Sequence, residues 1–194
     1  MSDSASRIYD FVYRAQLTEE ALDAAGRKNR RLADFEETET AKMLSLDVLD
    51  DQHVTNARAM ANVYVAIAAF ENSVRTLISH VLLEEVGVQW WESCVSEKIR
   101  SRAKEKQEEE AKVRWHVQRG EDPINYTQMP DLVSILRQNW PRFEPYIPTI
   151  EWAASLMEII ERSRNVIMHS GMLSRPDIER IGINIRDWIK QVGA

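Results

Sequence analysis

One histidine in this chain has neighbours suited to acid–base chemistry on a phosphate. His169 ends the hexapeptide Arg164-Asn165-Val166-Ile167-Met168-His169, which closes an apolar segment of helical periodicity and precedes Ser170-Gly171. Asn165 and His169 are four residues apart and share a helix face, so the amide can orient the imidazole. The long side chain of Arg164 can reach the same cleft. A general acid or base, an orienting amide and an anion-binding guanidinium together favour cleavage of a phosphodiester.

The spacing of this motif raises a geometric problem. On an unbroken helix, Arg164 and His169 differ in direction by about 140°. Their convergence therefore requires the end of the helix, the flexibility of arginine or a second subunit. Arg162 lies three residues before Asn165 and seven before His169, on their own stripe. Arg162 can share the phosphate-binding role, and the sequence does not separate the two arginines.

A second polar group interrupts a long apolar helical segment. Glu71 and Arg75 are four residues apart in the middle of a length that should be buried. One interpretation is a surface ion pair, which contributes only a few tenths of a kcal/mol. The other is a carboxylate turned toward the helix of Arg164 and His169, where it would hold a guanidinium or imidazole in place. Periodicity alone leaves both open.

The distribution of charge limits the kinds of partner. The net charge is −6 over 194 residues, which argues against a protein that simply coats nucleic acid. Residues 161–190 nevertheless carry six basic and four acidic side chains, so this region is +2 and the remainder is −8. The motif thus lies in the locally positive part of an acidic chain, although windows of this length can differ so by chance.

Several classes of site are poorly supported. A single cysteine, Cys94, excludes a disulfide framework and a cysteine-based zinc site. The four histidines form no His-x-x-x-His pattern, and no glycine-rich phosphate loop is present. No apolar stretch approaches the roughly 18 residues of a membrane span, and the first residues do not resemble a signal peptide. The sequence therefore predicts no metal, no cofactor, no membrane partner and a cytoplasmic location.

The low content of glycine and proline, six of each, favours an all-α fold. We expect an antiparallel bundle formed by residues 51–194, with an additional N-terminal helical segment of unknown role over 1–50. Within 1–50 the apolar spacing predicts a helix over 8–25. The helices expected after it are a long one over 55–86 ended by Gly87, a charged one over 97–119, a short one over 129–140, the motif helix from Thr149 and a final one after Ser174 or Asp177.

Particular core and capping positions follow from the same spacing. Gly171 is the expected left-handed residue after the motif helix. Trp90-Trp91 should form a hydrophobic corner after the long helix. Apolar residues of the charged helix are predicted at Ile99, Ala103, Val113 and Trp115. The apolar stripe of the motif helix is predicted to contain Ile150, Ala153, Leu156 or Met157, Ile160, Val166 and Ile167, and that of the last helix Ile178, Ile181, Ile185, Trp188 and Val192.

Four blocks of residues in order make this chain similar to the HEPN superfamily. Its ribonuclease members carry arginine, a polar residue, three variable residues and histidine, here Arg164 to His169. The resemblance extends to the branch shared with a nuclear messenger-RNA surveillance endoribonuclease, and it covers roughly residues 55–193. The blocks are Ala66-Ile67-Ala68-Ala69-Phe70-Glu71-Asn72-Ser73-Val74-Arg75, Trp90-Trp91, Ile124-Asn125-Tyr126-Thr127 with Asp131-Leu132, and Arg162-Ser163-Arg164-Asn165-Val166-Ile167-Met168-His169-Ser170-Gly171.

The resemblance implies a HEPN-like helical bundle that cleaves RNA as a homodimer without a metal. His169 would assist attack of an RNA 2′-hydroxyl on the adjacent phosphate, giving a 2′,3′-cyclic phosphate and a 5′-hydroxyl. Arg164 would bind the scissile phosphate, and Asn165 would position the imidazole. Glu71 and Arg75 match polar residues of the family's earlier helix, which favours a supporting role for them.

Two alternatives remain at this point. Many domains of this fold have no nuclease activity, so the chain can be a non-catalytic module that dimerises or binds a partner protein or nucleotide. His169 can also be a purely structural helix cap. Stand-alone proteins resembling this one often belong to toxin–antitoxin or anti-phage defence systems, which implies a possible antitoxin or other partner protein.

Overall fold

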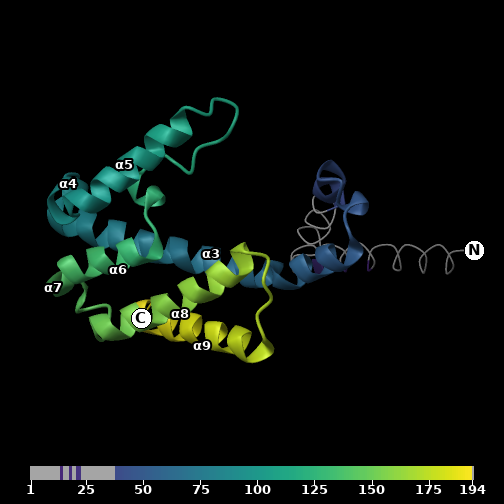
Figure 1. The fold of residues 1–194 in the computed structure, drawn as a ribbon. Coiled ribbons are helices and arrows are strands. Elements are labelled where there is room, and N and C mark those ends of the chain that lie inside the picture. The colour runs from purple at the N-terminus through teal and green to yellow at the C-terminus, as the bar shows by residue number, and fades with distance from the viewer. Residues whose placement is uncertain (1–13, 15–17, 19–20, 23–37, 194) are drawn as a thin grey trace, which may run out of the picture. The chain divides into compact units, whose positions relative to one another are not determined.

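The computed structural model describes residues 14, 18, 21–22 and 38–193 of the chain (Figure 1). Most of the helix expected over 8–25 lies outside the described residues. The chain divides into two compact units, Met1–Thr55 and Asn56–Ala194. In the first unit residues 38–43 are helical, and a 3-10 helix, η1, follows at Leu46–Val48.

Helices make up the regular structure of the described residues, which contain no strand, so the expected all-α fold is confirmed. No helix in this part of the chain is long and apolar enough to cross a bilayer. After η1 the elements are α3 (Asp51–Val86), α4 (Trp90–Cys94), α5 (Glu97–Ala111), η2 (Pro123–Tyr126), α6 (Met129–Gln138), α7 (Trp140–Phe143), α8 (Ile150–Met168) and α9 (Arg175–Val192).

The long helix α3 begins four residues before its predicted start at Thr55. Asp50 explains the difference, because its Oδ1 accepts hydrogen bonds from the backbone N–H groups of Gln52 (2.9 Å) and His53 (3.2 Å) and so caps the helix. The helix ends as predicted at Gly87, which has a φ of 81°. Its buried residues recur every three or four positions as far as Val81, which is followed directly by a buried Leu82: Met60, Val63, Ile67, Phe70, Val74, Ile78, Val81 and Leu82.

Helices α8 and α9 form a hairpin against which α3 and α6 pack (Figure 1). The Trp188 ring of α9 stacks on Trp152 of α8 at 5.9 Å, and it meets Phe70 of α3 edge-on at 5.6 Å. The predicted apolar face of the last helix is confirmed, since Ile181 and Trp188 are buried and its other members pack against the core. These contacts fix α8, the motif helix, against α3.

The N-caps of α8 and α9 agree with the sequence, with Ser174 the one of the two alternatives that caps α9, and the C-terminal end of α8 differs. Thr149 Oγ1 accepts the N–H of Trp152, and Ser174 forms a capping box with Asp177. At the C-terminal end of α8, Ser170 and not Gly171 is left-handed, with a φ of 61°. The N–H groups of Ser170 and Gly171 donate to Ile167 O and Val166 O, which is the Schellman pattern.

Gly171 is nevertheless required in that turn. A Cβ at this position would lie 2.7 Å from Val166 Cγ1 and 2.8 Å from Val166 O. The prediction of Gly171 as the left-handed residue is therefore wrong, because the turn closes one residue earlier and uses the glycine for close approach. Val166, predicted in the apolar stripe, is partly exposed beside this turn.

The charged helix α5 is shorter than predicted, ending at Ala111 instead of 119. Ile99 and Ala103 are buried as expected, whereas Val113 and Trp115 are exposed, Trp115 by 86%. Within α5, no apolar residue after Ala103 packs on the core. The carboxylates at 108–110 also stand at the negative end of the helix dipole, where they are unfavourable. The helix therefore stops where its packing stops.

Helix α4 lies where the sequence predicts a hydrophobic corner, and α6 and α7 lie where it predicts one short helix. Trp90 and Trp91 pack against the core from α4, which confirms the hydrophobic corner. The helix expected over 129–140 is divided into α6 and α7 at Asn139. The Asn139 side-chain amide donates to Ile135 O and to Cys94 O, both at 2.9 Å, and so joins the end of α6 to the last residue of α4.

Candidate active site

Arg164 lies on the flank of α8 that faces α3. Its Nε is 3.7 Å from Oε2 of Glu71, and the Arg164 side chain is 38% exposed while that of Glu71 is only 12% exposed. No hydrogen bond from the Arg164 guanidinium to the described residues is recorded at this site, so its Nη groups remain available. The Glu71 carboxylate therefore lies at ion-pair distance from one guanidinium nitrogen without a hydrogen bond to it, and the other nitrogens can bind an anion.

Glu71 is itself held by a second arginine. Arg75 Nη2 is 2.5 Å from Glu71 Oε1 and donates to Thr127 O at 3.0 Å, and Arg75 Nη1 donates to Asn72 Oδ1 at 2.9 Å. The Arg75 side chain is 14% exposed. Glu71 and Arg75 are therefore not a free surface pair. The structure agrees with the second interpretation of this pair, in which the Glu71 carboxylate is turned toward the helix of Arg164.

The polar cluster continues through residues that the sequence analysis did not select as site residues. Asp131 of α6 is buried, and its Oδ1 is 2.5 Å from Arg102 Nη2 of α5 while its Oδ2 accepts the Gln128 N–H at 3.0 Å. Asp131 also acts electrostatically on Glu161 of α8. The cluster thereby joins α3, α5, α6 and α8 around Arg164.

Glu161 is the member of this cluster with a perturbed protonation equilibrium. Burial raises the pKa of its carboxyl above the ordinary value of 4.5; Arg164 lowers it, and the carboxylates of Glu71, Glu158 and Asp131 raise it further. Glu161 precedes Arg164 by three residues and so shares its flank. The spacing of Glu161 and Arg164 was visible in the sequence. It could not identify Glu161 as a site residue, because the charges of Glu71 and Asp131 that act on it come from residues far away along the chain.

Asn165 and His169 lie on the opposite, exposed flank of α8. His169 is the C-cap residue, and its backbone N–H donates to Asn165 O at 3.1 Å. The hydrogen bonds recorded for this pair involve the backbone, and none joins the Asn165 amide to the imidazole. His169 is thus presented to solvent at the end of a well-fixed helix.

Arg162 belongs to this exposed flank and not to the Arg164 cluster. Its side chain is 78% exposed and pairs with Glu158 one turn earlier on the same helix. The structure therefore brings Arg164 to Glu71 and Arg75, and it places Arg162, Asn165 and His169 together on the other flank. Within one chain the described contacts do not bring Arg164 and His169 together.

Exposed apolar side chains lie next to the motif along the chain. Val166 and Met168 precede His169, Met172 follows it, and all three are solvent-exposed. Ser170 and Gly171 between them form the tight turn that fixes this end of α8. Apolar side chains grouped beside a polar motif are typical of a surface that another protein covers.

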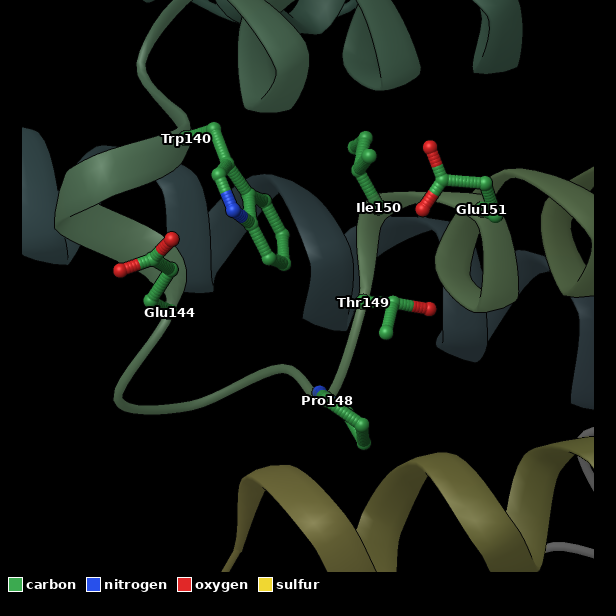
Figure 2. Close-up of a pocket in the computed structure, with 6 residues that line it drawn as sticks. All are labelled: Trp140, Glu144, Pro148, Thr149, Ile150 and Glu151. Carbon is green, nitrogen blue, oxygen red and sulfur yellow. The ribbon is translucent and has the colours of Figure 1, made fainter.

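A cavity of about 520 Å³ lies at the other end of α8 (Figure 2). Figure 2 shows Trp140 and Glu144 on one side of it and Ile150 and Glu151 on the other. The 19 residues of α8 span about 28 Å, so this cavity is far from His169. Its two carboxylates also disfavour a phosphate, and we do not assign the motif chemistry to it.

The described residues offer no group of three histidine, cysteine, aspartate or glutamate side chains arranged to hold a metal ion. The motif itself supplies a guanidinium that can bind an anion and an imidazole that can donate or accept a proton.

A protein-family model described as Swt1-like HEPN matches residues 66–193. The chain belongs to this family. Searches of curated proteins and of solved structures gave no match. The family match includes Glu71, Arg75 and the whole motif from Arg164 to His169. HEPN domains are often ribonucleases, so membership suggests an RNase-like or nucleotide-related function.

Proposed function

We propose that this HEPN protein is a metal-independent endoribonuclease that cleaves single-stranded RNA. The observation that supports the proposal most strongly is the arrangement on α8: an arginine paired with a largely buried carboxylate on one flank, and an exposed histidine where the helix ends. A fixed cation and a solvent-presented acid or base are the two groups that phosphodiester cleavage requires.

In this proposal His169 takes the proton of an RNA 2′-hydroxyl. The O2′–P bond forms and the P–O5′ bond breaks, and the leaving oxygen takes a proton from water. The products are a 2′,3′-cyclic phosphate and a 5′-hydroxyl. Arg164 binds the phosphate and the negative charge that builds on it, an interaction that strengthens in the transition state. Asn165 positions His169.

We propose further that Arg164 of one subunit acts with His169 of the other in a homodimer. The angular separation of the two residues on one helix supports this pairing. So do the exposed apolar side chains of Val166, Met168 and Met172, which a second copy of the chain would cover. A dimer also doubles the number of guanidinium groups at the seam of an acidic protein.

Glu71 and Arg75 act as positioning residues in this proposal. Glu71 restricts the guanidinium of Arg164, and Arg75 restricts Glu71 through its bond to Thr127 O. Because the three side chains form one connected series, the phosphate-binding group is oriented before substrate arrives, which lowers the cost of binding.

The test is cleavage of end-labelled RNAs of mixed sequence in EDTA, with the product ends analysed for cyclic phosphate. We expect cleavage by the wild type, and losses of about 10²–10³-fold in Arg164→Ala and about 10²–10⁴-fold in His169→Ala. Arg175→Ala is a matched control, because that arginine is exposed and pairs only within its own helix. Arg162→Ala separates the two candidate arginines, and we expect it to retain most of the activity.

A non-catalytic binding module is the second candidate. The observation in its favour is that Arg164 already has a carboxylate partner and the described contacts leave the His169 imidazole unoriented. If correctly folded wild type cleaves none of several RNAs, this candidate replaces the first. For either one we propose a toxin–antitoxin or anti-phage defence setting, in which an antitoxin or other partner restrains the protein.

A further inference from the structure

A second cavity, of about 630 Å³, lies between α3, α4 and η2. Its volume is in the range of small-molecule sites. It contains no residue of the Arg164–His169 motif, but Arg75 lines it. The cavity is therefore distinct from the motif and shares one side chain with the cluster that holds Arg164.

Two indole rings line one wall of this cavity. Trp90 and Trp91 stand edge to face, with centroids 5.5 Å apart and planes at 89°, and both pack against the core while remaining partly accessible. The rings are therefore fixed in orientation. Fixed aromatic rings at a cavity wall are suited to a flat aromatic ligand, and stacking of a nucleic-acid base on such a ring contributes about 1–3 kcal/mol.

The charges of the cavity favour a neutral ligand over a free phosphate. Glu92 and Asp122 contribute two carboxylates, and the charge of Arg75 is already balanced by Glu71. Neutral groups that donate and accept hydrogen bonds are also present, among them the Ser79 hydroxyl and the Asn125 amide. An aromatic ring with donors and acceptors on its edge, and without its own charge, fits this lining.

Arg75 carries a buried donor that its own contacts leave unused. Its Nη groups bond to Glu71, Asn72 and Thr127, whereas its Nε is buried and lacks a hydrogen-bond partner among the described residues. Because that nitrogen is buried, it is not in reach of a ligand in the cavity. The three bonded partners instead fix the position of the Arg75 side chain at the cavity wall before a ligand enters.

We propose that this cavity binds an unpaired nucleobase of the RNA strand next to the phosphate held by Arg164. The link is the Glu71 carboxylate, one oxygen of which contacts Arg75 of the cavity while the other contacts Arg164 of the motif. This inference rests on the proposed ribonuclease function and specifies its substrate. The base must be unpaired, because a paired and stacked base offers neither its face nor its edge.

The test uses oligonucleotides with one cleavage site and an abasic sugar at either flanking position. Their affinity for the full-length His169→Ala protein is measured by fluorescence anisotropy. One abasic position should weaken binding about tenfold, which corresponds to about 1.4 kcal/mol of lost stacking.

Variants of the cavity test where this loss of affinity arises. Ser79→Tyr, which fills the cavity, should bind the intact and abasic strands equally, and Trp91→Leu should reduce the difference in affinity between the two strands. Ser73→Tyr, on α3 but outside the cavity, should retain the tenfold difference.

An equal abasic penalty in Ser79→Tyr and in Ser73→Tyr overturns the proposal. A second outcome concerns the source of the base. If a nucleoside monophosphate displaces RNA from Ser73→Tyr, whose cavity is open, and no abasic position changes the affinity, then the cavity binds a free nucleotide. That result overturns the proposal that the base belongs to the RNA strand. Cleavage of RNA by the wild type is measured in parallel. Cleavage without a cavity effect contradicts only this inference, whereas absence of cleavage contradicts the proposed function itself.

Discussion

The side chains on the two flanks of α8 differ in how firmly neighbouring residues hold them in position. On the flank toward α3, Arg164 is restrained by Glu71, which Arg75 restrains in turn. On the other flank Asn165 and His169 face solvent, and only the backbone of the helix end is fixed. One helix therefore holds a pre-oriented cation and an acid–base group that the single chain leaves incomplete. In the proposed homodimer, the other subunit completes the second flank.

The largest expected effect comes from breaking the proposed subunit contact at the exposed C-terminal end of α8. Met168→Glu places a carboxylate among exposed apolar side chains beside His169. We expect the dimer to weaken at least tenfold, or by about 1.4 kcal/mol, and RNA cleavage to fall with it. Sedimentation and cleavage rates, measured over a range of protein concentrations, test this.

Met43→Glu is the control for that substitution, because Met43 is also an exposed methionine but lies in the N-terminal unit. It should leave sedimentation and cleavage unchanged. A Met168→Glu protein that remains fully dimeric and active would contradict the assignment of this flank to an interface.

Neutralising Glu71 tests the restrained flank. Glu71→Gln keeps the shape of the side chain but removes the charge that faces Arg164 and Arg75. We expect kcat/KM for RNA to fall about tenfold, because Arg164 is no longer oriented. The free energy of unfolding should fall by about 1–3 kcal/mol, because the Arg75 charge loses its partner.

Glu158→Gln is the matched control on the exposed flank. It removes the carboxylate partner of Arg162, which is an exposed pair within one helix. Surface pairs of this kind contribute about 0–1 kcal/mol, so both kinetics and stability should change little. If Glu71→Gln and Glu158→Gln changed kcat/KM and the free energy of unfolding equally, the proposed difference in restraint between the two flanks would be wrong.

Substitutions at the two residues of the turn after His169 should change the free energy of unfolding in opposite directions. Gly171→Ala forces a Cβ against Val166 Cγ1 and O, so the free energy of unfolding should fall by about 1–3 kcal/mol. Ser170→Gly removes the cost of a left-handed serine, so stability should rise by about 0.5–1 kcal/mol. Urea titration measures both, and the same sign for the two would contradict the Schellman assignment.

The smallest expected effect is the pH dependence contributed by Glu161. Its pKa is raised in the folded state, mainly by burial, so the folded protein binds this proton more readily than the unfolded chain. Its contribution to stability is therefore fully present below 4.5 and is lost as pH rises through the folded-state pKa. Relative to wild type, Glu161→Gln should gain stability as pH rises through that window. A difference that is constant with pH would contradict the assignment.

Much of the fold follows from apolar spacing and capping residues. The stripe from Met60 to Leu82 and the face of Ile181 and Trp188 predict α3 and α9, because each repeats at the helical period over several turns. The C-terminal end of α5 does not follow, since its residues favour helix locally and only the absence of packing after Ala103 stops it. Ser170 was not expected to be left-handed, because Gly171 beside it is intrinsically better suited.

The site was predictable only where its residues are close together along the chain. The motif from Arg164 to His169 and its division between two flanks follow from helix geometry. The contact between Glu71 and Arg164 remained one of two interpretations, because it depends on the rotation of α3 against α8. Glu161, Asp131 and Arg102 were not selected, because their significance comes from burial and charge contributed by four separate helices.

The most direct test of the proposed site is complementation between two inactive subunits. Arg164→Ala and His169→Ala chains with different tags are co-expressed, and the heterodimer is purified by both tags. If Arg164 of one subunit acts with His169 of the other, the heterodimer retains one intact site of two, and we expect about half of the wild-type activity. A folded heterodimer as inactive as either mutant homodimer would contradict a site shared between subunits.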